Sequence, residues 1–204
     1  MKHKNSLSRG LLLGLALAAC MPAVFADTPL DASSTAGTGT KAIPGDSIYQ
    51  LAPHLTDQDG KPFALASARG GPVLISMFYS SCEMVCPVLF ETIAQTLKEL
   101  PPATRDRLKI VMITFDPARD TLAVLKDTAD KHHCDKHWSL VRGKDAEVRQ
   151  IAALLGVQYR RLPSGEFNHS SAILLLDGDG RVVMRSGRLG TIDPALVEAL
   201  IQVR

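Results

Sequence analysis

The chain has 204 residues, of which 46% are hydrophobic, 22% charged and 5% aromatic, proportions that exclude collagen-like, coiled-coil and wholly disordered proteins. Its formal charge of +2 arises in the first 26 residues, which hold Lys2, Lys4 and Arg9 and no acidic residue; the remainder has 20 basic against 21 acidic side chains, a net charge of −1. A chain with this charge balance is not expected to bind nucleic acid.

Residues 1–26 have the order of a secretory signal, with basic residues first, then the apolar run Leu11–Ala19, then small residues up to Ala26. Cleavage after Ala26 is one outcome. A second is lipidation, because the sequence ending at Cys20 (Leu-Ala-Ala-Cys) resembles a bacterial lipobox, and a third is an uncleaved membrane anchor. All three predict an extracytoplasmic, periplasmic location, either soluble or tethered to a membrane.

Residues 27–47 are rich in Thr, Ser, Ala, Gly and Pro, a composition that predicts a flexible leader. Residues 48–204 are expected to form one domain, since they contain no repeat. Once Cys20 has been removed, three cysteines remain: Cys82, Cys86 and Cys134. Disulfides persist outside the cytoplasm, but an odd number leaves at least one thiol unpaired, intermolecular or available as a ligand.

The first half of the domain alternates buried strands with helices. The continuous apolar run Pro72–Phe78 predicts a buried strand. A helical pattern then runs from Cys86 to about Leu100, with Pro87 in its first turn, where proline is tolerated. A second buried strand is expected at Lys109–Phe115. Asp116-Pro117 predicts the N-cap and first residue of the next helix, about Ala118–Lys131.

The second half is expected to contain an extended piece, a helix that Gly156 ends, three strands and a final helix after Asp193-Pro194. The predicted ranges are Trp138–Val141, Asp145–Leu155, Val157–Leu162, Ala172–Leu176 and Arg181–Arg185, the last two strands being joined as a hairpin through Asp177–Gly180. This order predicts an α/β protein: a thioredoxin-like fold with a helix-containing insertion and a C-terminal β-hairpin plus helix.

Two cysteines lie where the first buried strand ends and the first helix begins, in the sequence Cys82-Glu-Met-Val-Cys86-Pro87. Four residues make one helical turn, so both sulfurs can face the same way. Backbone N–H groups at a helix start stabilise thiolates. Such a pair can form a disulfide, attack one, or hold a soft metal. A purely structural disulfide would close a very small loop and gain little.

A soft ion such as Cu(I) held by two thiolates needs a third donor, for which imidazole is suited. His169 stands in a loop directly before the predicted strand Ala172–Leu176. In a thioredoxin-like sheet the start of this strand approaches the loop that carries the cysteines. His169 is therefore the expected third ligand, beside Cys82 and Cys86.

The stretch from about Tyr49 to Val203 resembles the Sco/SenC family, copper-binding proteins of thioredoxin fold that assist assembly of the CuA centre of cytochrome c oxidase. The matching segments are Gly71–Tyr79, Cys82-x3-Cys86-Pro87, Phe115-Asp-Pro-x-Arg-Asp-Thr121 and His169-Ser170-Ser171. The resemblance implies that Cys82, Cys86 and His169 bind Cu(I), and also Cu(II), and that the cysteines form a redox dithiol. It implies a partner such as the CuA subunit of an oxidase, another copper protein, or another periplasmic thiol or copper carrier.

Two features depart from that family. Many members carry Asp before the site histidine, whereas this chain has Asn168, which implies weaker Cu(II) binding. The segment His132-His133-Cys134-Asp-Lys-His137 has spacings that, on a helix, suit metal ligands and an auxiliary copper-loading site. The alternative is a polar helix end.

Roles are also expected for residues near the cysteines. Asp116 is expected to cap a helix or to lie beside the metal site, and Arg119 and Asp120 to be surface or salt-bridge residues. Tyr79 is expected to pack in the core. Met84 is expected to cover apolar surface, the alternative being a weak thioether ligand.

Two functions fit the sequence. The first is a copper chaperone that holds Cu(I) through the three ligands and passes it to a partner's thiolates. The second is an extracytoplasmic thiol–disulfide reductase that keeps a partner's cysteines reduced. His169 favours the first, since thiol exchange does not require it. Chaperoning implies no catalytic turnover, so an enzyme activity is expected only for the second function.

Overall fold

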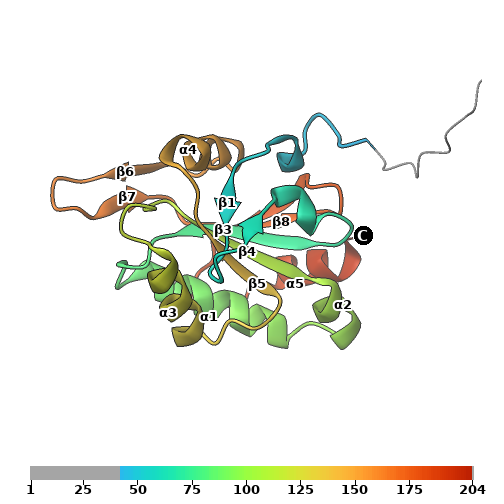
Figure 1. The fold of residues 1–204 in the computed structure, drawn as a ribbon. Helices are drawn as coiled ribbons and strands as arrows, with labels where there is room; N and C mark the ends of the chain where they lie inside the picture. The colour runs from blue at the N-terminus through green and yellow to red at the C-terminus, as the bar shows by residue number, and fades with distance from the viewer. Residues whose placement is uncertain (1–41, 204) are drawn as a thin grey trace, which may run out of the picture. The chain divides into compact units, whose positions relative to one another are not determined.

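A five-stranded sheet forms the centre of the protein in the computed structural model, which describes residues 42–203 (Figure 1). The strands run in the order β5-β4-β3-β8-β9. Their bounds are β3 (Val73–Phe78), β4 (Lys109–Thr114), β5 (Trp138–Val141), β8 (Ile173–Leu176) and β9 (Val182–Ser186). β3, β4 and β5 are parallel, while β8 and β9 run antiparallel to their neighbours. β3 is buried along its whole length, as its unbroken apolar sequence predicts.

Helices cover both faces of this sheet. The described residues form α1 (Val85–Lys98), α2 (Pro102–Arg107), α3 (Leu122–Lys131), α4 (Asp145–Leu154) and α5 (Pro194–Gln202). In Figure 1, α4 lies on the opposite side of the sheet from α1, α3 and α5. The predicted boundary signals are confirmed where Gly156 follows α4 at φ +61° and where the Asp193 side chain accepts the N–H of Ala195 at the start of α5.

Glu147 caps the start of α4. It accepts hydrogen bonds from the backbone N–H of His54 and from the His54 ring, which in that order lower its pKa to about 2.

Among residues 42–203, no helix is both long enough and apolar enough to cross a membrane.

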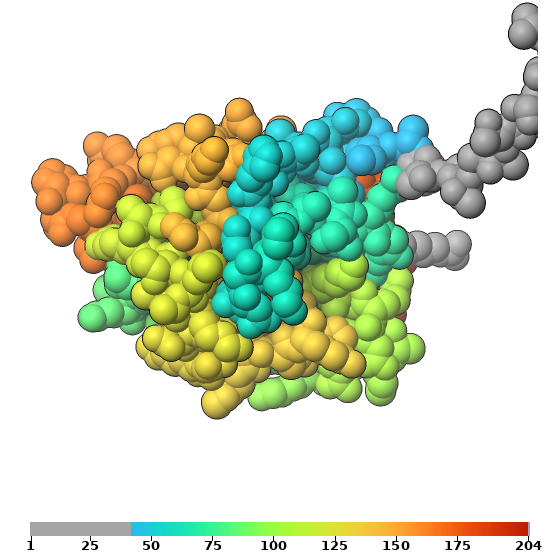
Figure 2. Space-filling model, in the orientation of Figure 1, coloured from blue at the N-terminus to red at the C-terminus, as the bar shows by residue number. Residues whose placement is uncertain are grey.

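The connection from β5 to β8 carries the predicted insertion, which consists of α4 and a two-stranded hairpin. The hairpin pairs β6 (Tyr159–Arg161) with β7 (Phe167–His169) in an antiparallel sheet of their own. We call this hairpin, residues 159–169, the arm. It projects from the side of the molecule in Figures 1 and 2, where it is orange.

The smaller elements lie before the central sheet. They are the 3-10 turns η1 (Ile48–Gln50) and η2 (Leu65–Ala68) and the strand pair β1 (Leu55–Thr56) and β2 (Pro62–Phe63). The predicted α/β architecture, with its C-terminal hairpin of β8 and β9 and final helix, is confirmed. From β3 to the end of the described residues, the elements that were not predicted are the short helix α2 and the strand β7.

The helix after β4 begins later than the sequence predicts. Asp116 does not cap it, because α3 starts at Leu122 and the Thr121 side chain accepts the N–H of Val124 as the N-cap. Asp116 instead opens a turn, in which its carbonyl accepts the N–H groups of Arg119 and Asp120. The prediction was wrong because the Asp116 carboxylate binds Arg119 rather than a helix start.

The predicted signal sequence, the lipidation or anchor alternatives at Cys20, and residues 27–41 of the leader lie outside the described residues. Residues 42–47 are described, and Ser47 is buried with its hydroxyl donating to the carbonyl of Asp179. Residues 42–203 belong to one compact unit. The domain boundary at residue 48 and the flexible leader stay predictions.

Candidate metal centre

The two cysteines are placed by the short loop between β3 and α1. β3 ends at Phe78, and the chain turns at once, with the carbonyl of Tyr79 accepting the N–H of Cys82 at 3.2 Å. α1 begins at Val85, so Cys86 occupies its first turn, as predicted. Both thiols are buried, and neither forms a disulfide.

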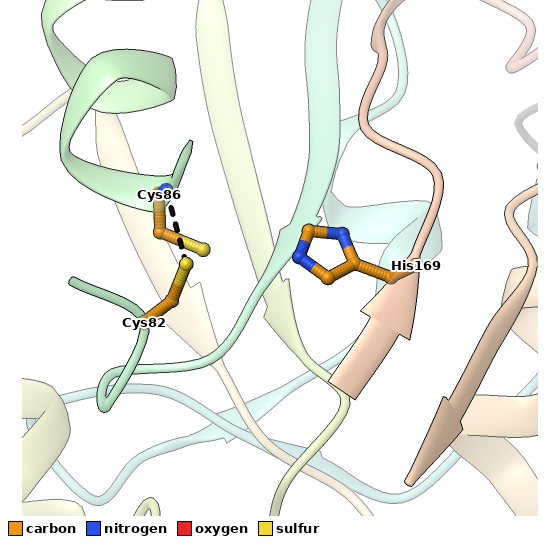
Figure 3. Close-up of side chains that lie close together, drawn as sticks. All are labelled: Cys82, Cys86 and His169. Atoms are coloured by element: carbon orange, nitrogen blue, oxygen red, sulfur yellow. Dashed lines mark hydrogen bonds between the residues drawn. The ribbon is translucent and has the colours of Figure 1, made fainter. Parts of the chain in front are cut away.

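The start of α1 holds the sulfur of Cys82. The backbone N–H of Cys86 donates to Cys82 Sγ at 3.3 Å (Figure 3). Burial acts to raise the pKa of Cys82, but hydrogen bonds from Cys86 and from the backbone of Met84 and Val85 outweigh it, and the net pKa is lowered. Cys82 is therefore the thiol that ionises first, as expected at a helix N-terminus.

Cys86 has the opposite character. Burial raises the pKa of this thiol well above its usual value, and the negative charges of Cys82 and Asp120 raise it further. The thiolate form is thus favoured at Cys82 and disfavoured at Cys86, where binding of a cation would favour loss of the proton.

His169 reaches the cysteines from the arm. Predicted as a loop residue, it is the last residue of β7 and pairs with Tyr159. Its Nδ1 lies 3.3 Å from the carbonyl of Ser170 and 3.2 Å from the hydroxyl of Ser171. Figure 3 shows the other ring nitrogen facing the two sulfurs. Contacts at Nδ1 orient the ring and leave Nε2 available to a ligand.

The three residues that the sequence singles out lie together. One ligand atom from each of Cys82, Cys86 and His169 lies within 4.8 Å of the other two, and among residues 42–203 this is the one such group found. Metal–sulfur and metal–nitrogen bonds of about 2.0–2.3 Å place three atoms around a trigonal ion about 3.5–4 Å apart. Small side-chain rotations would bring this set to that spacing, so it fits a soft metal ion.

Aromatic rings surround the histidine and hold the arm against the core. The His169 ring lies 5.7 Å from that of Tyr79, edge to face, and 5.1 Å from that of Phe115, while Phe167 contacts both tyrosine and phenylalanine. Tyr79 packs as predicted, and its hydroxyl also donates to Glu166 of the arm at 2.7 Å. Burial first, and then this hydrogen bond, raise the pKa of Tyr79.

A second tether joins the arm to the loop after β4. Arg119 forms an ion pair with Asp116, which confirms its predicted salt bridge, and its Nη2 donates to the carbonyl of Gly165 at 2.7 Å. Gly165 has φ +90° at the turn of the arm, a conformation that favours glycine. Asp116 therefore acts on the site through Arg119 and the arm.

Asp120 was expected to be a surface or salt-bridge residue, and this prediction was wrong, because it is buried and forms no ion pair with residues 42–203. Its side chain is fully buried behind the cysteine loop. The carboxyl accepts hydrogen bonds from the Ser80 backbone, the Ser80 hydroxyl and the Thr114 hydroxyl. These bonds attach the start of the cysteine loop to β4, which explains why an acidic residue is buried there.

Two cavities flank the cysteine loop. One, of about 510 Å³, lies between the loop and the arm and is lined by Cys82 and His169 together with Met84 and Glu166. The other, of about 230 Å³, lies between α1 and α3 and is lined by both cysteines. Met84 was expected to cover apolar surface, but it is 79% exposed at the edge of the first cavity, so this prediction was wrong.

The segment from His132 to His137 does not form a second ligand group. α3 ends at Lys131, so the segment lacks the helical spacing on which the prediction rested. The His132 ring stacks on Phe90 with centroids 4.2 Å apart, and His137 Nδ1 lies 3.1 Å from the carbonyl of Leu108. Burial raises the pKa of Cys134 to about 12. His132, Cys134 and His137 thus have separate contacts.

Three polar residues of the site were not predicted. Ser171 orients the histidine, Glu166 fixes the arm and Asp120 holds the cysteine loop. The role of Ser171 could have been predicted from the motif His169-Ser170-Ser171, because a hydroxyl two residues after a histidine can reach its ring. The other two depend on contacts between distant segments.

The model of the SCO1/SenC family matches residues 46–199 of the chain. A SCO2-like protein of Rickettsia felis is 31% identical over 133 residues, which cover 62% of this chain and 63% of that protein. The match therefore spans less than two thirds of this relative.

Two solved structures are similar. Bradyrhizobium japonicum ScoI with copper bound has a TM-score of 0.65 and 28% identity, covering 76% of this chain and 98% of that one. Yeast Sco1 with copper bound has a TM-score of 0.63 and 25% identity, covering 74% and 86%. The thioredoxin-like fold predicted from the sequence is thereby confirmed.

Proposed function

The chain belongs to the SCO1/SenC family, and from this we propose that it is a copper chaperone that holds Cu(I) through Cys82 Sγ, Cys86 Sγ and His169 Nε2. The observation that carries the proposal is the convergence of these three ligand atoms within 4.8 Å of one another. Two thiolates and an imidazole form a soft, three-coordinate set that suits Cu(I). Similar structures with copper bound support the same metal.

The chain's own groups account for loading and release. Cys82, whose pKa is lowered, supplies the first thiolate, and binding of the cation then favours loss of the proton from buried Cys86. His169 comes from the separate arm, so its bond can break without displacement of either sulfur. An incoming thiolate from a partner can then take its place, and copper passes to the partner by ligand exchange.

We propose the CuA-bearing subunit of a cytochrome c oxidase as the recipient, with another copper protein as the alternative. The family resemblance supports this recipient. The N-terminal sequence supports a periplasmic or otherwise extracytoplasmic location, soluble or tethered through Cys20 or the N-terminal segment. Cu(II) can use the same ligands, but Asn168 adds no negative charge beside His169, so weaker binding of Cu(II) is expected.

Anaerobic titration of the reduced domain with Cu(I), against a chromophoric competitor, tests the proposal. We expect one tightly bound copper per chain and a sharp loss of affinity in His169→Ala, larger than the about tenfold to hundredfold that removal of a residue supporting a ligand costs. His133→Asn is a matched control, because Asn tolerates the left-handed conformation of His133 at φ +53°. Weak binding by the wild type, or equal affinity in His169→Ala, would contradict the proposal.

A thiol–disulfide reductase is the second candidate, favoured by the opposite pKa shifts of Cys82 and Cys86. A lowered pKa suits an attacking thiol, and a buried neighbour can resolve the mixed disulfide. The same titration variants separate the two functions. Reduction of a disulfide-containing peptide should survive His169→Ala, whereas copper binding should not.

A further inference from the structure

Three arginines lie on the arm or against it, near the histidine ligand: Arg160 is on one face of the hairpin, and Arg149 and Arg161 lie by the aromatic rings of the other face. Arg160 and Arg161 lie on β6, and Arg149 lies on α4 with its guanidinium 5.3 Å from the centre of the Tyr159 ring. Arg161 lies 5.9 Å from the centre of the Phe167 ring. All three are exposed. We call them the arm arginines.

None of the arm arginines forms an ion pair with a residue between 42 and 203. The nearby carboxylates are engaged elsewhere, since Asp116 binds Arg119 and Glu166 accepts the hydroxyl of Tyr79. Asp145 lies four residues before Arg149 but outside ion-pair distance. The arm arginines therefore have no ion-pair partner among the described residues, and two of them lie against aromatic rings.

The register of the arm explains why Arg160 is available. Arg160 pairs across the strands with Asn168, one residue before His169. Because side chains alternate along a strand, these two lie on the face opposite to Phe167 and His169. Arg160, Asn168 and His169 also line one cavity of about 510 Å³. A neutral amide thus stands where a carboxylate could compensate Arg160.

From this arrangement we infer that the arm arginines are a docking surface for a partner protein whose copper-accepting site is surrounded by acidic residues. Arg160 and Arg161 lie on the same hairpin as His169, and Arg149 lies against its Tyr159, so a partner bound there is adjacent to the ligand that must leave. Complementary charge raises association rates by about 10–1000-fold and selects against basic partners. An anionic membrane is the less suitable occupant, because membrane-binding segments usually contain about 4–8 clustered basic residues. The inference rests on the proposed function, which it deepens by naming the chemistry of the partner.

Binding can be measured without copper, so the test does not depend on the proposed function. The probe is a dye-labelled synthetic peptide in which a Ser-x3-Ser core, replacing the acceptor cysteines, is flanked by glutamates. The same core flanked by glutamines is the reference. Fluorescence anisotropy gives the affinity of each peptide for the reduced, copper-free chain at about 20 mM and about 200 mM salt.

We expect the glutamate peptide to bind about tenfold more tightly than the glutamine peptide at low salt, and most of this difference to disappear at high salt. Arg160→Glu/Arg161→Glu should abolish the difference. Arg160 makes no ring contact, so Arg160→Glu alone, or Asn168→Asp, should reduce the difference without loss of the packing at Phe167.

Lys98→Glu/Lys136→Glu is the control, because it changes the net charge equally at exposed positions distant from the arm. Lys98 ends α1, about 20 Å along the helix from the cysteines. Equal binding of the two peptides, or an equal loss in this control, would overturn the inference. A third outcome would also overturn the inference: the glutamate peptide does not bind, but the chain binds vesicles that contain phosphatidylserine, and this vesicle binding depends on the arm arginines. A chain that binds the peptide but not Cu(I) would refute the proposed function alone.

Discussion

The buried carboxyl of Asp120 should be one of the main supports of the cysteine loop. It accepts bonds from three donors, the Ser80 backbone, the Ser80 hydroxyl and the Thr114 hydroxyl, at a position with no solvent exposure. A hydrogen bond to a charged group contributes about 1.5–3 kcal/mol, and donors left without a partner add a desolvation cost. Since the three bonds share one acceptor group, Asp120→Ala should lower the free energy of unfolding by about 3–5 kcal/mol.

Equilibrium unfolding in urea measures this change. Trp138 is buried and is the single tryptophan of the chain, so its fluorescence reports the transition. Asp120→Asn keeps one acceptor oxygen and should lose only about 1–2 kcal/mol. Asp127→Ala, an exposed residue of α3, is the control and should change stability by less than about 0.5 kcal/mol. If Asp120→Ala cost no more than this control, the reasoning would be refuted.

Iodoacetamide at about pH 7.5 should modify Cys82, whose pKa is lowered, before Cys134, whose pKa burial raises to about 12, and peptide mass spectrometry would measure the order. The pKa of Glu147 falls from 4.5 to about 2 on folding, so its ionised form stabilises the protein above about pH 4.5. Glu147→Gln should therefore be less stable than the wild type there, and urea unfolding should show the difference vanish as the pH falls towards 2. Gly180→Ala would place a Cβ 2.5 Å from the ring of Tyr49 at φ +81° and should lose about 2–4 kcal/mol of unfolding free energy.

Each of these predictions has a defined contradiction. Equal alkylation of Cys82 and Cys134 would show that the helix start does not favour the Cys82 thiolate. A stability difference for Glu147→Gln that persists at pH 2 would exclude the ionised carboxylate as its source. Gly70→Ala is the control for Gly180, because Gly70 has φ +94° but no atom within 4 Å of an added Cβ, and it should lose only about 1–2 kcal/mol.

The central sheet could be predicted because its strands are continuous apolar runs, which have few other stable environments. β3 is the clearest case, since all six residues from Val73 to Phe78 are buried. The start of α1 could be predicted equally well, because a proline such as Pro87 is tolerated in a helix only in its first turn. α3 was misread at its start, since an Asp-Pro pair is compatible with both a helix start and a turn, and only the contact of Asp116 with Arg119 decides between them.

The three residues of the site could be predicted by type and position, but their supports could not. β7 is only three residues long, and its composition does not predict a strand. Its pairing with β6 depends on the register of the two strands. That register places Asn168 opposite Arg160 and turns His169 inward. Asp120 was missed for a related reason, because its burial depends on donors 40 and 6 residues away along the chain.

The histidine belongs to a two-stranded sheet that shares no strand pairing with the central one, whereas the cysteines belong to the central sheet's own loop and helix. An ion bound to all three would therefore act as a cross-link between two separate sheets, in addition to the hydrogen bonds of Tyr79 with Glu166 and of Arg119 with Gly165. Amide protons of the arm should exchange with solvent more slowly in the loaded protein. Substitutions at the tethers of the arm, Arg119 and Glu166, could then adjust the lifetime of the bound ion while leaving both sulfurs untouched, so that retention and release can evolve independently of the dithiol.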